Sequence, residues 1–212
     1  MADRLINDLY PTMPWDEIDA VVFDIGNVLV AMDEDQVLAT MFPGDPLLQH
    51  RVQMRTTRVP YWNMLDGGMP VEACITAMAG NEPDLVEPIR RFLTCWPDYR
   101  YVVEEGRKAV YTCKAHGKKL YILSNYTSEH FARNEREYDF FSLFDGAVIS
   151  AREHMLKPFR CIYDLLIERY QLNPSRTLFI DDTPANIAGA FAAGWHGFCK
   201  NEPGKLSAFL GE

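Results

Sequence analysis

The chain has 212 residues and a formal net charge of −9, and 48% of its residues are hydrophobic. This length suits one domain, or one core with a modest insert, and the composition is that of a packed protein rather than a disordered one. The negative charge argues against nucleic acid and anionic membrane surfaces as partners, because both attract clustered Lys and Arg. No apolar run approaches the length of a membrane span.

The cysteines predict a reduced, cytoplasmic protein. There are five of them, an odd number, widely spaced and without a C-x-x-C pair. This pattern favours free thiols and gives no indication of a zinc site. The first residues contain no long apolar stretch, so we expect no signal peptide. The sequence leaves open whether the protein is a monomer or a homodimer.

The first predicted strand, residues 20–25, contains the most informative acid. It follows an N-terminal extension, residues 1–19, which we expect to pack loosely on the core. Val21, Val22 and Phe23 run up to Asp24, and an apolar run of this kind is typical of a buried parallel strand. Asp24 would then lie at the strand's C-terminal end, where open α/β sheets bind ligands, and Gly26 would let the backbone turn.

Residues 33–96 differ from the rest of the chain. They contain helical stretches interrupted by Pro and Gly, such as Gly67-Gly68-Met69-Pro70, and no strong strand pattern. We therefore predict a helical insert at 33–96 and a core formed by residues 1–32 and 97–212. Four residues of the insert either line a pocket or divide into buried aromatics and solvated arginines: Arg55, Arg58, Tyr61 and Trp62.

Strands and helices alternate after the insert. Such alternation predicts right-handed crossovers, and hence an α/β fold with a parallel sheet of five or six strands, the Asp24 strand in the centre and helices on both faces. The predicted strands are 119–123, 146–149, 177–180 and 195–199, and the predicted helices are 101–116, 129–138, 159–170 and 184–193.

Polar residues follow several of these strands. Ser124 follows one strand, Lys157 lies in the loop after the next, and Asp181-Asp182 follow a third. Individually, Ser124 could end a turn and Lys157 could be a solvated loop residue. Adjacent acids at the edge of a core repel each other, however, and a divalent cation would relieve that repulsion. Together with Asp24, these side chains form a coherent phosphoryl-transfer site.

The motifs Asp-x-Gly-Asn, Ser-Asn, Lys-Pro and Asp-Asp-x-x-x-Asn occur in this order between residues 24 and 186. In this the chain resembles the haloacid dehalogenase superfamily of hydrolases, and the insert resembles the small cap domain of that superfamily. The Asp-x-Gly-Asn form is similar to the branch of sugar-phosphate phosphatases that act on glucose 1-phosphate. The fold implied is a Rossmann-like sheet with a helical cap.

The resemblance implies a magnesium-dependent phosphatase that hydrolyses a small phosphomonoester through an aspartyl-phosphate. It implies that Asp24 is the nucleophile, assisted by Ser124 and Lys157. Mg²⁺ would be held by Asp24, the backbone carbonyl of Gly26 and Asp182, with Asp181 binding through a water. The phosphate-binding residues implied are Gly26, Asn27, Ser124, Asn125 and Lys157. Asn186 either fixes the Asp181-Asp182 loop by a hydrogen bond or is a helix surface residue.

One position departs from the family pattern. Most phosphatases of the superfamily carry a second Asp two residues after the nucleophile, which serves as general acid and base, and here this position is Gly26. General acid catalysis typically contributes about 10²–10⁴-fold. Three explanations stay open: the leaving group is good, another group supplies the proton, or turnover is slow.

Two other functions are compatible with these motifs. A 2-haloacid dehalogenase shares the Asp, Ser-Asn and Lys motifs and needs no metal, although Asp181 and Asp182 would oppose the binding of a carboxylate substrate. A catalytically weakened phosphate-binding protein is the second alternative.

Overall fold

The structure, a computed structural model, describes residues 5–58 and 60–211. Its core is a five-stranded parallel sheet in the order β5-β4-β1-β6-β7. The α/β class, the strand number and the central position of the Asp24 strand are therefore confirmed. The strands are β1 (Ala20–Phe23), β4 (Lys119–Ser124), β5 (Gly146–Ile149), β6 (Thr177–Asp181) and β7 (His196–Cys199).

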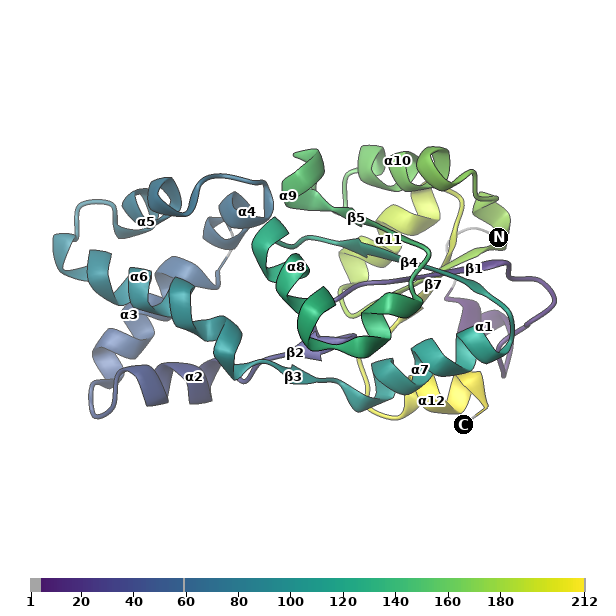
Figure 1. Ribbon diagram of the computed structural model, residues 1–212, viewed down its shortest axis with the longest axis horizontal. Helices are drawn as coiled ribbons and strands as arrows, with labels where there is room; N and C mark the ends of the chain where they lie inside the picture. Colours follow the sequence, from purple (N-terminus) through teal and green to yellow (C-terminus); the bar gives the residue numbers. More distant parts are fainter. Residues whose placement is uncertain (1–4, 59, 212) are drawn as a thin grey trace.

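Helices cover both faces of this sheet (Figure 1). Alternate residues of β1 point to opposite faces: Val21 and Phe23 pack in one apolar cluster, and Ala20 and Val22 in another. Because both faces are buried, the strands are apolar throughout. One cluster includes residues of α1 (Ile6–Leu9), α7 (Glu104–Ala115), α8 (Ser128–Glu137) and α12 (Lys205–Leu210), and the other includes residues of α10 (Arg160–Tyr170) and α11 (Pro184–Ala192).

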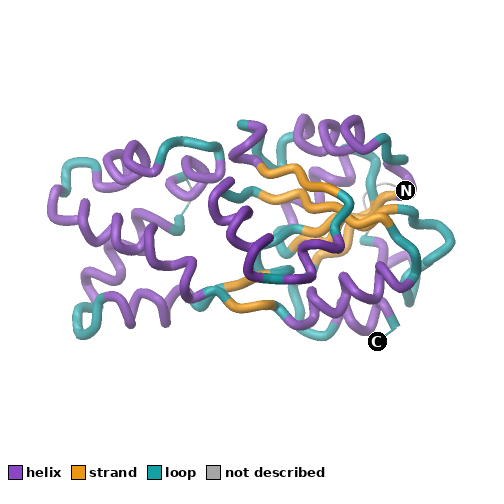
Figure 2. Tube along the Cα trace, in the orientation of Figure 1, coloured by secondary structure: helices purple, strands orange, loops and turns teal. Residues whose placement is uncertain are grey.

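The predicted helical insert follows β1 and forms a separate lobe beside the C-terminal ends of the strands (Figures 1 and 2). This lobe, which we call the cap, has its own apolar cluster, which includes Val52, Ile75, Phe92 and Trp96. The cap helices are α2 (Glu34–Met41), α3 (Pro46–Thr56), α4 (Tyr61–Asp66), α5 (Val71–Ala79) and α6 (Val86–Cys95).

Two short antiparallel strands connect the cap to the core. β2 (Val30–Ala31) leads into the cap and pairs with β3 (Tyr101–Val102), which leads out of it. The helix predicted for 101–116 is therefore wrong at its start, since α7 begins at Glu104. The pairing with β2 keeps Tyr101 and Val102 extended, a conformation that aromatic and β-branched residues favour.

The N-terminal extension does not pack loosely, contrary to the expectation. Ile6 and Ile18 are fully buried in the core, and the amide of Met13 donates a hydrogen bond to the Phe209 carbonyl. Apolar side chains spaced through the extension thus complete the core beside α12. Among the described residues, no helix is long and apolar enough to cross a membrane.

Candidate functional site

Asp24 lies directly after β1, at the carboxyl edge of the sheet. Its side chain is almost fully buried, with the residue only 7% exposed. Oδ1 accepts hydrogen bonds from the Ile25 amide at 2.8 Å and lies 2.9 Å from Lys157 Nζ. The strand end thus presents one carboxylate oxygen that is held in place by a cation.

The turn after Asp24 differs from the expectation for Gly26. Asn27, with φ 54°, adopts the left-handed conformation, and a Cβ added at Gly26 would meet no atom within 4 Å. Asn tolerates this conformation better than most residues. Asn27 Nδ2 also donates to Asp182 Oδ2 at 2.8 Å, which ties the Asp24 turn to the Asp181-Asp182 loop.

Lys157 lies under the cap with a side chain that is 1% exposed. Its backbone is held on both sides by Asn125, whose Oδ1 accepts from the Lys157 amide at 2.8 Å and whose Nδ2 donates to the Lys157 carbonyl at 3.1 Å. Asn125, which we expected to bind phosphate, therefore holds the loop that contains Lys157 against the end of β4.

Ser124, the last residue of β4, is also buried. Its hydroxyl forms no hydrogen bond of good geometry with a described residue, although it lies near enough to the Asp24 carboxylate to act against the rise of the pKa of that group. A buried polar atom without a partner is costly in a folded protein. A ligand oxygen bound at this edge of the sheet would give the hydroxyl a partner.

Asp181 is fully buried, and both of its carboxylate oxygens are engaged by donors. Oδ1 accepts from the Thr183 amide at 2.8 Å, and Oδ2 accepts from Lys157 Nζ at 2.6 Å. Asn186 Nδ2 lies 3.1 Å from each oxygen. Asn186 thus fixes the loop by a hydrogen bond, the first of the two alternatives. A carboxylate has about four lone-pair sites, so Asp181 is close to saturated.

Asp182 is less buried than Asp181, and it completes a group of three acids. One carboxylate oxygen from each of Asp24, Asp181 and Asp182 lies within 4.8 Å of the others. Carboxylate oxygens at this spacing match the hard ligands that Mg²⁺ prefers. The donor set therefore fits a magnesium ion, with Asp24 and Asp182 better able than Asp181 to bind it directly.

The charges at the site are strongly coupled. Burial raises the pKa of Asp24 to about 7, a shift that Lys157 opposes and Asp181 reinforces. Burial alone would lower the pKa of Lys157, but the charges of Asp24 and Asp181 outweigh it and the pKa is raised. Lys157 thus stays an ammonium ion. A bound cation would favour the ionised form of Asp24.

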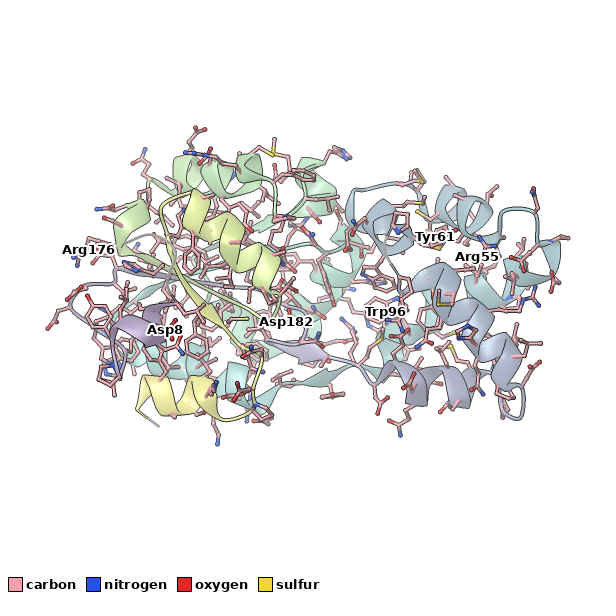
Figure 3. All side chains as sticks on the ribbon, turned by 180° about the vertical axis from the view of Figure 1, so that it is seen from behind. Asp8, Arg55, Tyr61, Trp96, Arg176 and Asp182 are labelled. Atoms are coloured by element: carbon pink, nitrogen blue, oxygen red, sulfur yellow. The ribbon has the colours of Figure 1, made fainter. Side chains whose placement is uncertain are left out.

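A cleft of about 330 Å³ lies between the core and the cap. In Figure 3, Asp182 lies on the core side of the gap and Trp96 on the cap side. The residues that line the cleft are Gly26, Asn27, Val30, Ala31, Met32, Glu34, Thr57, Trp62, Trp96, Arg100, Asn125 and Tyr126. The cap contributes two tryptophans and the polar residues Glu34 and Thr57, and the amide side chains of the core lie at the sheet end.

The four insert residues singled out from the sequence divide in the structure. Trp62 lines the cleft, whereas Arg58 is exposed. Arg55 donates a hydrogen bond to the Tyr61 hydroxyl at 2.9 Å and pairs with Glu82, so these contacts stay within the cap (Figure 3).

Sequence reasoning missed other residues at this boundary. Asp66, in front of a Gly-Gly pair, has the sequence signal of a turn residue, yet it is buried with the residue 4% exposed. Trp96, Arg100 and Tyr126 lie outside the motifs. Their position in the cleft depends on the packing of the cap against the core, for which the sequence carries no local signal.

Comparisons with known proteins agree with this architecture. Residues 18–194 match the haloacid dehalogenase-like hydrolase family. A sesquiterpene phosphatase of Aspergillus oryzae is 30% identical over 84 residues, which are 40% of this chain and 43% of that protein. The matched segment thus spans less than half of this relative.

Solved structures share the fold at low sequence identity. A haloacid dehalogenase family enzyme of Bacteroides thetaiotaomicron, in complex with magnesium and inorganic phosphate, is 19% identical, with a TM-score of 0.63 over 86% of this chain and 93% of that one. The L-2-haloacid dehalogenase of Xanthobacter autotrophicus with covalently bound chloropropionic acid is also 19% identical, with a TM-score of 0.63 over 85% and 76%. Because the family match covers most of the sequence, the chain belongs to the haloacid dehalogenase-like hydrolases.

Proposed function

We propose that the protein is a magnesium-dependent phosphatase that hydrolyses a small phosphomonoester through an aspartyl-phosphate on Asp24. The observation that carries the proposal is the convergence, at one edge of the sheet, of three carboxylates, the ammonium of Lys157 and the unpartnered hydroxyl of Ser124. Two similar proteins add support: the Bacteroides enzyme was solved in complex with magnesium and inorganic phosphate, and the Aspergillus relative is named a phosphatase.

Each residue has a definite part in this reaction. An oxygen of Asp24 attacks phosphorus, the bond to the leaving oxygen breaks, and water later hydrolyses the acyl phosphate. Ser124 and Lys157 bind the phosphoryl oxygens, together with the turns at Gly26-Asn27 and Asn125. Magnesium, held by Asp24, the Gly26 carbonyl and Asp182, would screen the repulsion between the nucleophile and the phosphate.

A dehalogenase is the second candidate, because the Xanthobacter enzyme shares the fold. The Asp181 and Asp182 carboxylates beside Asp24 argue against it, since a metal-free site with this charge would repel a haloacid carboxylate.

The test is the hydrolysis of 4-nitrophenyl phosphate with magnesium or with EDTA. We expect turnover with magnesium alone, loss of turnover in Asp24→Asn, and homoserine at position 24 after borohydride reduction of the quenched enzyme. Asp8→Asn is a matched control, because Asp8 lies at the end of the core far from the cap (Figure 3). Halide release from a 2-haloacid would instead identify a dehalogenase, and phosphate binding without any turnover would favour the binding protein.

The size and the lining of the cleft would select the substrate. Its volume of about 330 Å³ suits a small organic phosphate. The sequence motifs favour a sugar phosphate, whose ring could stack on Trp62 or Trp96. The two tryptophans of the cleft and the name of the Aspergillus relative instead favour the ester of an apolar alcohol. A panel of hexose, aryl and prenyl phosphates, ranked by kcat/KM, separates these two classes.

A further inference from the structure

The cap presents a buried carboxyl group, that of Asp66, at its boundary with the core. Asp66 is the last residue of α4, and it is 4% exposed. No described residue donates a hydrogen bond to its side chain, in contrast to Asp181. A buried acid without such donors is unusual, because the group must find a partner or stay neutral.

The position of Asp66 is fixed by the core. The Ser150 hydroxyl donates to the Asp66 carbonyl at 2.6 Å, and a ring nitrogen of His154 lies 3.1 Å from the Gly67 carbonyl. Gly68, with φ +86°, lies so close to the core that an added Cβ would be 2.7 Å from the Ala151 carbonyl oxygen. This loop, residues 66–68, is therefore docked on α9 (Ser150–Glu153), with Asp66 above the carboxyl ends of the strands.

The charged and titratable groups near Asp66 come from the core. Burial raises the pKa of Asp66 to about 7, with the charge of Asp24 acting in the same direction and Lys157 opposing both. The raised pKa of Tyr126 is caused first by burial, and Asp66 contributes to it. The docked loop at the end of β5 therefore brings the Asp66 carboxyl near enough to Asp24 and Lys157 for their charges to act on it.

We propose that Asp66 is the general acid and base of the reaction, delivered by the cap in place of the second Asp that Gly26 replaces. The inference rests on the proposed phosphatase function. It answers the question left by Gly26, whose backbone can bind a metal but cannot supply a proton.

The proton then moves in a closed cycle. Asp24 attacks phosphorus, and the bond from phosphorus to the leaving oxygen breaks with its electron pair on that oxygen. The oxygen takes the proton of the Asp66 carboxyl group and departs as an alcohol. The Asp66 carboxylate next removes a proton from a water, whose oxygen attacks phosphorus. The bond from phosphorus to Asp24 breaks, the electron pair returns to the Asp24 carboxylate, and inorganic phosphate leaves.

The decisive test compares two substrates of nearly the same shape, 4-nitrophenyl phosphate and 4-nitrobenzyl phosphate. The first has a leaving group that is stable as an anion, and the second must be protonated as it leaves. In Asp66→Asn we expect kcat/KM to fall by about 10²-fold or more for the benzyl ester and by less than about 10-fold for the nitrophenyl ester. Because the same residue activates water, we also expect the aspartyl-phosphate to accumulate in the variant.

Three further variants sharpen the test. Asp84→Asn, an exposed acid of the cap, is the matched control and should not change either substrate. Gly68→Ala keeps the carboxyl group but moves the docked loop, so it should also slow the benzyl ester selectively. A Cβ added at Gly26 would meet no atom within 4 Å, so in the double variant with Asp66→Asn, Gly26→Asp should recover benzyl ester turnover.

The outcomes separate this inference from the function on which it rests. A wild-type protein that hydrolyses neither ester with magnesium overturns the phosphatase function and the role of Asp66 together. An active wild type, with an Asp66→Asn variant that loses the same factor on both esters or loses nothing, overturns the role of Asp66 alone.

Discussion

The ammonium of Lys157 lies 2.9 Å from Oδ1 of Asp24, in a pair whose side chains are 1% and 10% exposed. The same ammonium is hydrogen-bonded to Asp181 at 2.6 Å, so two buried acids share one cation. Removing one partner of a buried pair leaves an uncompensated charge, which typically costs about 3–5 kcal/mol.

We therefore predict that Lys157→Met lowers the free energy of unfolding by about 3 kcal/mol in EDTA. Magnesium should stabilise this variant more than the wild type, because the ion would replace the lost positive charge. Urea unfolding with and without magnesium measures both effects. Lys205→Met is the matched control, since its pair with Glu202 is exposed and should contribute about 0–1 kcal/mol. Equal stabilisation of Lys157→Met and wild type by magnesium would contradict the prediction.

The two adjacent acids should respond differently to substitution. Asp182→Asn or Asp182→Ala should abolish magnesium binding and activity with little change in stability, because Asp182 is the less engaged acid. Asp181→Asn should lower stability as well, since Asp181 accepts hydrogen bonds from Lys157, Asn186 and Thr183. Calorimetric titration with magnesium and thermal unfolding distinguish them. Wild-type magnesium affinity in Asp182→Asn would make Asp181 the direct ligand.

The aromatic wall of the cleft should act on the leaving group and not on the phosphate. Trp62 lines the cleft and lies 5.5 Å from Trp96, measured between ring centroids. An aromatic contact contributes about 0.5–1.5 kcal/mol beyond its buried area, so Trp62→Ala should lower kcat/KM for aryl phosphates by roughly 10-fold. Inhibition by inorganic phosphate should stay unchanged. Tyr61→Phe is the control, because Tyr61 is next in sequence and its hydroxyl is bonded within the cap. Weaker inhibition by phosphate in Trp62→Ala would show that Trp62 acts on phosphate binding instead of on the leaving group.

His130 should make stability depend on pH. Burial, followed by the charge of Arg100, lowers the pKa of His130 to about 4. An ordinary His has a pKa of about 6.5, so as pH falls the imidazole of His130 is protonated in the unfolded chain before it is protonated in the folded protein. Proton binding then favours the unfolded chain, and the free energy of unfolding decreases as pH falls from about 6.5 towards about 4.

Between pH 7.5 and pH 5 we expect the wild type to lose about 2 kcal/mol more than His130→Gln, as measured by urea unfolding at both values. His50→Gln, on an exposed face of the cap, should behave as the wild type does. An identical pH dependence in wild type and His130→Gln would show that the His130 pKa is not lowered by folding.

The sequence by itself determined the sheet and its edge. The strands of a sheet covered on both faces are apolar throughout, so β1, β4, β5, β6 and β7 could be recognised from local composition. Parallel strands bring their carboxyl ends to one edge, so Asp24, Ser124 and Asp181 were expected to lie close together. A helical insert was likewise evident from the Gly and Pro residues that interrupt it.

Only the tertiary structure decided how the insert meets the core. Tyr101 and Val102 form a strand because Val30 and Ala31 lie beside them, a partner distant in sequence. Asp66 has the local signal of an exposed turn, and it is buried because Ser150 and the close approach at Gly68 dock its loop on the core. Hydrophobic periodicity records which residues of one element face inward, whereas the burial of a polar loop residue depends on contacts between elements that are far apart in the chain.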